Sequence, residues 1–151
     1  MDWEIRNTDK FRYHTYLKEI LKPIIDDIGD LDWLVSGLDY IAFTDANLPI
    51  NFEEDHFILS NEQFMQLLDI DIQFLFGVFL AIPSNIKIHV DTDHLPYADL
   101  NKLVWKKGNF QHPDAKIELI CFDSSSTIVK FKDESLSMKF HKYFEEALEL
   151  K

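Results

Sequence analysis

Apolar residues recur at helical spacing in two parts of the chain, one near each end. The first stripe runs between residues 10 and 28, and Gly29 ends it. Pro23 lies inside this stretch and should kink the helix or end it, because proline lacks a backbone N–H and clashes with the preceding turn. The second stripe follows Ser135, which we expect to cap a C-terminal helix. The stripes are Tyr13, Leu17, Ile20, Leu21, Ile24 and Ile28, then Leu136, Phe140, Tyr143, Phe144, Ala147 and Leu148.

A third, short helix is predicted at Ser60-Asn61-Glu62-Gln63. This sequence is a capping box, in which the Ser60 hydroxyl and the Gln63 side chain satisfy two backbone amides that the first turn leaves without partners. Phe64, Leu67 and Leu68 give this helix one apolar face. Residues 95–105 carry a weaker helical pattern.

Short apolar runs between the helices predict strands. Residues 73–82 are apolar on both faces, as expected of a central strand. Residues 117–122 and 127–132 flank the turn sequence Asp123-Ser124-Ser125-Ser126 and predict a hairpin. The other predicted strands are residues 3–6, an edge strand at 86–90, and a hairpin or meander at 31–35 and 39–44 around Ser36-Gly37-Leu38, with residues 46–55 as a loop.

This order of elements predicts a single α+β domain spanning residues 1–151. We expect a mainly antiparallel or mixed sheet of about five to six strands, covered by about three helices, with the C-terminal helix packed on the sheet. The chain is long enough to bury about two-thirds of its unfolded surface, and its 13 Phe residues supply a core.

Negative charge is concentrated in the first half of the chain. Residues 1–75 hold 16 Asp and Glu against 5 Lys and Arg, a net charge of −11, whereas residues 76–151 hold 11 against 10. Such an asymmetry favours a basic protein partner over a nucleic acid or an anionic membrane. The predicted partner-binding residues are Asp26, Asp27, Asp30 and Asp32 in a first cluster and Glu53, Glu54 and Asp55 in a second; Asp69 and Asp71 form a third cluster.

Aromatic residues close to these carboxylates are candidates for anchoring a partner, because buried aromatic side chains carry much of the energy of protein interfaces. The candidates are Trp33, Tyr40, Phe52 and Phe57. Trp33 and Tyr40 lie on predicted strands, so they are equally suited to the core.

The sequence His89-Val90-Asp91-Thr92-Asp93-His94 is the stretch that most resembles an enzyme site. In an extended strand, His89, Asp91 and Asp93 project from the same face, and imidazole and carboxylate donors together bind Zn, Mn or Fe(II). The alternative interpretation is a polar turn after an edge strand. No zinc-enzyme spacing is matched elsewhere, so we expect neither a cofactor nor a catalytic residue.

Other chemistry finds little support in the sequence. The four glycines form no phosphate-binding loop, and the three serines of the hairpin turn lack the glycines of a hydrolase nucleophile. The only basic cluster, Lys102, Lys106 and Lys107 near Trp105, reads as a solvated helix end, so no nucleic acid is expected.

The cellular setting is predicted from three further features. Cys121, the single cysteine, lies in an apolar run and reads as a buried, inert thiol. The N-terminus lacks the features of a signal peptide, and the longest apolar stretch, residues 74–83, is too short to span a membrane. These features predict a cytoplasmic protein without a membrane segment.

Two regions of the chain are similar to one of the uncharacterised bacterial families of domains of unknown function. The matching residues are Glu19-Ile20-Leu21-Lys22-Pro23-Ile24, Trp33, Leu119-Ile120-Cys121-Phe122-Asp123-Ser124 and Thr127-Ile128-Val129, which are 16 of the 151 residues. The resemblance implies a bacterial cytoplasmic accessory protein and supplies no activity and no site residues.

The sequence therefore favours a non-enzymatic binding module over an enzyme. We expect an acidic protein of the immunity or antitoxin kind that covers the positive cleft of a basic partner, such as a nuclease toxin, with its N-terminal half. The alternatives are a metal-dependent enzyme that uses His89, Asp91 and Asp93, and a housekeeping interaction domain whose acidity serves solubility. The oligomeric state is left open.

Overall fold

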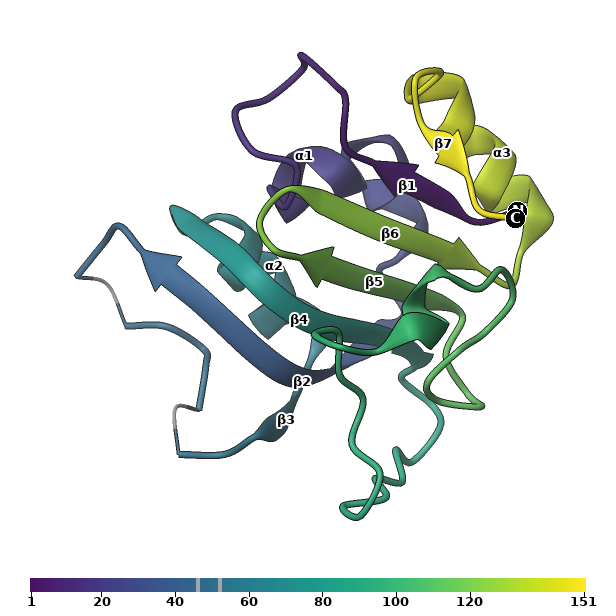
Figure 1. Ribbon diagram of the computed structural model, residues 1–151. Coiled ribbons are helices and arrows are strands. Elements are labelled where there is room, and N and C mark those ends of the chain that lie inside the picture. Colours follow the sequence, from purple (N-terminus) through teal and green to yellow (C-terminus); the bar gives the residue numbers. More distant parts are fainter. Residues whose placement is uncertain (46, 52) are drawn as a thin grey trace.

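The computed structural model describes residues 1–45, 47–51 and 53–151. They form one antiparallel sheet of seven strands in the order β3-β2-β4-β5-β6-β1-β7 (Figure 1). The α+β class predicted from the sequence is confirmed, with more strands than the five to six expected. The strands are β1 (Trp3–Ile5), β2 (Leu31–Ala42), β3 (His56–Leu59), β4 (Ile72–Pro83), β5 (Ile117–Phe122), β6 (Ser126–Phe131) and β7 (Leu148–Glu149).

The helices and a long irregular segment cover opposite faces of this sheet (Figure 1). The α-helices α1 (Leu17–Leu21), α2 (Asn61–Leu68) and α3 (Glu134–Tyr143) share one face with the 3-10 helix η1 (Lys22–Asp27). Residues 84–116, here called the covering segment, include the 3-10 helix η2 (Lys102–Trp105) and lie on the other face. None of the described helices is long and apolar enough to cross a bilayer.

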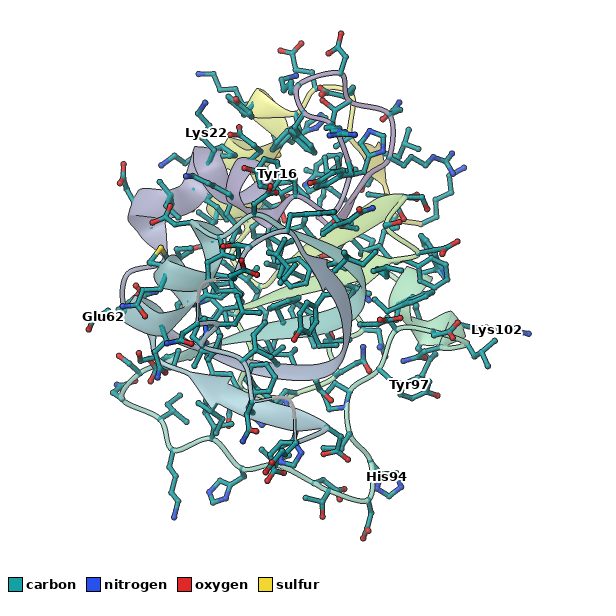
Figure 2. All side chains as sticks on the ribbon, turned by 90° about the vertical axis from the view of Figure 1, so that its left-hand side faces the viewer. Tyr16, Lys22, Glu62, His94, Tyr97 and Lys102 are labelled. Carbon is teal, nitrogen blue, oxygen red and sulfur yellow. The ribbon has the colours of Figure 1, made fainter. Side chains whose placement is uncertain are left out.

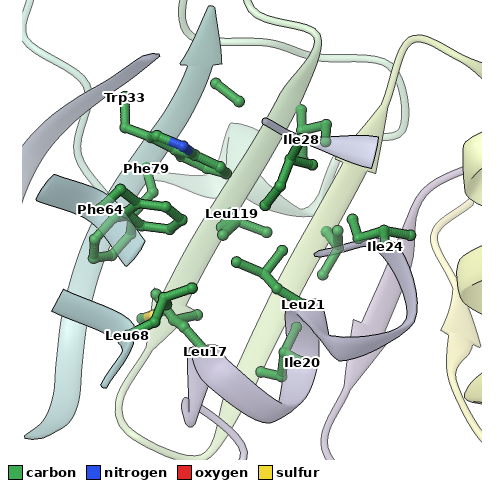
Figure 3. Packing of buried hydrophobic residues seen from close by; sticks show 14 of the residues in the cluster. Leu17, Ile20, Leu21, Ile24, Ile28, Trp33, Phe64, Leu68, Phe79 and Leu119 are labelled. Carbon is green, nitrogen blue, oxygen red and sulfur yellow. The ribbon is translucent and has the colours of Figure 1, made fainter. Parts of the chain in front are cut away.

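The larger part of the core lies between the sheet and the helices (Figure 3). Its centre is Trp33, which is fully buried and stacks on Phe64 of α2 with ring centroids 3.9 Å apart. The predicted capping box orients α2 for this contact: the Ser60 hydroxyl accepts from the Gln63 amide, and the Gln63 side chain accepts from the Ser60 amide. Local sequence and long-range packing therefore agree at this helix.

The helices are shorter than the apolar stripes predict. The first stripe becomes the five-residue α1 followed by η1, because Pro23 lies in the first turn of η1, where it ends the α-helix. At the other end, Asp133 and not Ser135 caps α3, accepting from the Ser135 and Leu136 amides. The helix α3 ends at Tyr143, although the predicted stripe runs on to Leu148. The chain turns after Tyr143 and returns as β7 beside β1.

The predicted hairpin or meander of two strands at residues 31–35 and 39–44 is wrong, because β2 is one strand of 12 residues. Gly37 takes a φ of +63°, which glycine adopts without strain. This glycine allows a bulge instead of a turn: the register against β4 shifts between Ser36 and Asp39 and again between Asp39 and Tyr40. Pairing with β3 ends at Ser36, so the second half of β2 extends beyond β3.

The predicted edge strand at residues 86–90 is absent, because these residues belong to the irregular covering segment. Lys130 of β6 fastens this segment to the sheet. Its Nζ is fully buried and donates to the carbonyl oxygens of Leu103 at 3.4 Å, Lys106 at 3.0 Å and Asn109 at 2.8 Å. The Glu118 carboxylate, paired with Lys130 across the β5–β6 ladder, lies 4.0 Å from the same Nζ.

Cys121 lies in β5 and is fully buried, as predicted. Burial raises the pKa of its thiol, which removes the thiolate that reacts with electrophiles. We expect the disulfide reagent DTNB to leave the native protein unlabelled and to label one thiol per chain in concentrated guanidinium chloride, read as thionitrobenzoate absorbance. Equal labelling rates in the two solutions would contradict the buried position.

Candidate interaction surface

The acidic residues are concentrated in a stretch that contains no lysine or arginine at all. From residue 23 to residue 86 the chain holds 12 Asp and Glu, and no cation follows Lys22 until Lys87. We call these 64 residues the cation-free segment. The charges of the two halves of the chain do not reveal the ends of this segment. The longest run without Lys or Arg in the sequence does reveal them.

Apart from its first residues, which belong to η1 and pack against α1 and α3, the described part of the cation-free segment lies at one edge of the sheet. It supplies β3, β2 and β4, which are neighbours at one edge of the sheet, together with α2, which packs on β2 and β3. Of its 12 carboxylates only that of Asp32 is partly buried, and the other 11 are exposed. Figure 2 faces this side of the molecule: Glu62 projects outward at the start of α2, with Lys22 apart from it.

The first predicted cluster lies where η1 meets the start of β2. Asp26 and Asp30 are exposed, whereas Asp27 and Asp32 have structural partners. The Asp27 carboxylate lies 2.7 Å from the Nζ of Lys139 on α3, and Asp32 Oδ1 accepts from the Asn61 amide at the start of α2. Two of the four residues therefore hold elements together, and Asp26 and Asp30 are the ones free to meet a partner.

The second cluster lies in the loop before β3. Asn51 shapes this loop, because its side chain accepts from the Glu53 amide and its carbonyl accepts from the Glu54 amide. The Asp55 carbonyl accepts from the Gly37 amide at the bulge of β2, and the Asp55 carboxylate lies 2.8 Å from His56 Nδ1. Glu53, Glu54 and Asp55 are all exposed.

The third cluster lies at the far end of α2. The Asp69 carboxylate is 3.0 Å from the Nζ of Lys18 on α1, and this contact raises the pKa of Lys18. Asp71 follows just before β4, and its carbonyl accepts from the Phe43 amide beyond the end of β2.

These clusters form a strip along β2 and not a single patch. Asp32 and Gly37, which mark the positions of the first two clusters, are five residues apart on the strand, which is about 17 Å at about 3.4 Å per residue. The third cluster, beside Phe43, lies about another 20 Å along. A strip of this length suits a protein partner, whose interface typically covers about 800 Å² on each side, better than a small ligand.

The predicted aromatic anchors divide into core and surface residues. Trp33 is part of the core, with no exposed surface, so it does not anchor a partner. Phe52 lies outside the described residues. Tyr40 and Phe57 are partly buried and line a cavity of about 290 Å³ between β2 and the loop before β3. Burial raises the pKa of the Tyr40 hydroxyl.

The stretch from His89 to His94 forms a polar turn. Asp91 Oδ2 lies 3.0 Å from His94 Nδ1, and Asp91 Oδ1 accepts from the Asp93 amide at 3.0 Å. The hydrogen bond from His94 lowers the pKa of Asp91. His89, Asp91 and Asp93 do not converge, because this stretch is not the strand on which their common face depended. Among the described residues, no three His, Cys, Asp or Glu side chains are grouped to hold a metal ion.

His112 has a structural role beside this turn. It is buried; its Nε2 lies 2.7 Å from the His89 carbonyl oxygen, and its Nδ1 accepts from the Asp114 amide. These partners require the neutral ring with a proton on Nε2. His112 therefore ties two parts of the covering segment together.

No family model, no curated protein and no solved structure matches this chain.

Proposed function

We propose that this chain is a non-enzymatic protein-binding module whose cation-free segment docks on a basic protein. The observation that carries the proposal is the 64-residue run without Lys or Arg, whose strands are neighbours at one edge of the sheet and whose 12 carboxylates are, except for that of Asp32, exposed. A field of one sign over such an area steers an oppositely charged partner into contact and raises its association rate.

The kind of partner follows from the same features. A protein of the immunity or antitoxin class covers the basic substrate cleft of a toxin such as a nuclease, and a strip of carboxylates along one sheet edge has the shape and charge for that role. Nothing favours the metal-dependent alternative, because His89, Asp91 and Asp93 do not converge. The housekeeping alternative, acidity for solubility alone, predicts no salt-sensitive partner.

Charge reversal on the strip tests the proposal. Asp26→Lys with Asp30→Lys changes two exposed carboxylates that form no side-chain hydrogen bond or ion pair with the described residues, and moves the formal net charge from −12 to −8. The matched control, Asp99→Lys with Glu145→Lys, makes the same change on exposed positions outside the cation-free segment. Immobilised wild-type protein and both variants are incubated with a lysate of the source cells at low and at high salt, and captured proteins are quantified by mass spectrometry.

We expect wild-type protein to retain a basic protein at low salt. Recovery should fall about tenfold with Asp26→Lys/Asp30→Lys and again with high salt, because both weaken attraction across the strip. The control pair should retain wild-type recovery. Captured proteins that are not basic, equal losses with both pairs, or no capture above bare resin would each contradict the proposal. A captured nuclease should also be inhibited by one equivalent of the protein, which tests the immunity class.

A further inference from the structure

The cavity lined by Tyr40 and Phe57 combines an apolar interior with an acidic rim. Leu38 and Tyr40 of β2, Phe57 of β3 and the buried Ile50 form its apolar side, and the exposed Glu54 and Asp55 stand beside them. The cavity lies beside Gly37, where β3 stops pairing with β2 while β2 continues. The strip of carboxylates is therefore hollowed at its second cluster.

We propose that this cavity, the Tyr40 pocket, receives an arginine side chain of the basic partner; the inference rests on the proposed function. The three methylenes of arginine suit the apolar side of the pocket, and its guanidinium stacks on aromatic rings more readily than an ammonium does. Two neighbouring carboxylates complement the five N–H donors of that planar group. The pocket thus offers a partner for each part of one side chain.

The size of the pocket also points to a side chain. Its volume of about 290 Å³ lies at the lower limit for small-molecule sites, which typically span about 300–1,000 Å³. A side chain that belongs to a partner protein can bind in a smaller cavity than a free small molecule, because other contacts along the strip hold the rest of the partner.

A second cavity shows why the rim decides the occupant. Between α1 and α2, Ile25, Met65 and Leu68 line a cavity of about 360 Å³ that is also apolar inside. Its rim carries two lysines and two carboxylates, and each carboxylate is already paired: Asp69 lies 3.0 Å from the Nζ of Lys18, and Glu19 lies 3.9 Å from that of Lys22. A cationic side chain would find both carboxylates there already paired with lysines, so this cavity is an internal control within the same chain.

Titration with Nα-acetyl-arginine amide tests the inference without a protein partner. Amide chemical shifts of ¹⁵N-labelled protein should move at Leu38, Asn51, Glu54 and Phe57, with a dissociation constant of about 1 mM, as is usual for a single side chain. Nα-acetyl-citrulline amide, which has the same shape without the charge, should cause shifts at least fivefold smaller. Nα-acetyl-lysine amide should bind more weakly than the arginine probe.

Matched variants locate the site. Glu54→Gln with Asp55→Asn keeps side-chain size and the hydrogen bond to His56, and should abolish the shifts. Asp26→Asn with Asp30→Asn makes the same change in net charge at the first cluster and should leave them intact. Thermal unfolding of each variant verifies that it is folded.

Three results would overturn the Tyr40 pocket: equal shifts with citrulline, shifts spread evenly over all acidic clusters, or unchanged binding by Glu54→Gln/Asp55→Asn. These failures differ from a failure of the proposed function. Loss of the arginine site leaves salt-sensitive capture through Asp26 and Asp30 intact, whereas loss of capture leaves the response to the arginine probe intact.

Discussion

At pH 8, where Glu118 is ionised because burial raises its pKa only to about 7, Lys130→Met is expected to reduce the free energy of unfolding by about 3–5 kcal/mol, the usual loss when one partner of a buried ion pair is removed. The variant keeps most of the apolar stem but removes three hydrogen bonds to backbone carbonyls of the covering segment. It also leaves Glu118, which is fully buried, without the cation 4.0 Å away. Typical domains have about 5–15 kcal/mol of stability in total, so such a loss is large.

Urea denaturation measures this loss as a lower midpoint. Lys132→Met is the matched control, because Lys132 is exposed and donates to a single carbonyl, that of Pro113 at 2.8 Å. It should change stability by less than about 1 kcal/mol. Hydrogen exchange should accelerate in the Lys130 variant at residues 103–111, the part of the covering segment that Lys130 fastens. Equal midpoints for the two variants would show that the buried lysine fastens nothing.

The role of Lys130 illustrates what the sequence could not reveal. The β5–β6 hairpin was predicted nearly to the residue, because its alternation and turn sequence are local signals. That hairpin places Glu118 opposite Lys130, a pair that normally faces solvent. The covering segment contacts both side chains and helps to bury them. Its backbone is irregular, so the weak patterns at residues 86–90 and 95–105 did not predict its position. The predicted edge strand at residues 86–90 failed for the same reason.

In the candidate site, too, the sequence predicted the positions of the charges but not their long-range contacts. The acidic clusters were recognised because charge is directly readable, and chain order carried over into space because β2, β3 and β4 are neighbours in the sheet. Their individual roles were not readable. Asp27 and Asp32 are held by Lys139 and Asn61, residues more than 25 positions away.

Aromatic residues were the hardest to assign from sequence. Trp33 and Tyr40 lie on the same strand with similar neighbours, but α2 covers Trp33 through Phe64, and the β2 bulge lies between the two residues. Tyr40 consequently lines an open cavity. Predicting that difference requires knowing that Gly37 forms a bulge in one strand and not the turn of a hairpin, which depends on the length of β4 opposite.

Glu118→Gln is expected to remove a marked pH dependence from the stability of the protein. Burial raises the pKa of the Glu118 carboxyl from 4.5 to about 7, although Lys130 and Gln111 oppose the shift. Between these two values the folded protein keeps a proton that the unfolded chain releases, so stability falls as pH rises through this window and is constant above it. A displacement of about 2.5 pH units corresponds to about 3 kcal/mol.

The difference between wild-type protein and Glu118→Gln isolates this effect, because the pH dependence of all other groups largely cancels. Glutamine imitates the protonated carboxyl, so the two proteins should have similar stability near pH 4.5. The variant should then gain on the wild type by up to about 3 kcal/mol by pH 8 in urea denaturation. A constant difference across the series would mean that Glu118 is ionised throughout, with Lys130 compensating its burial fully. The buried pair would then be a salt bridge and not, as expected here, a charged lysine beside a neutral acid below pH 7.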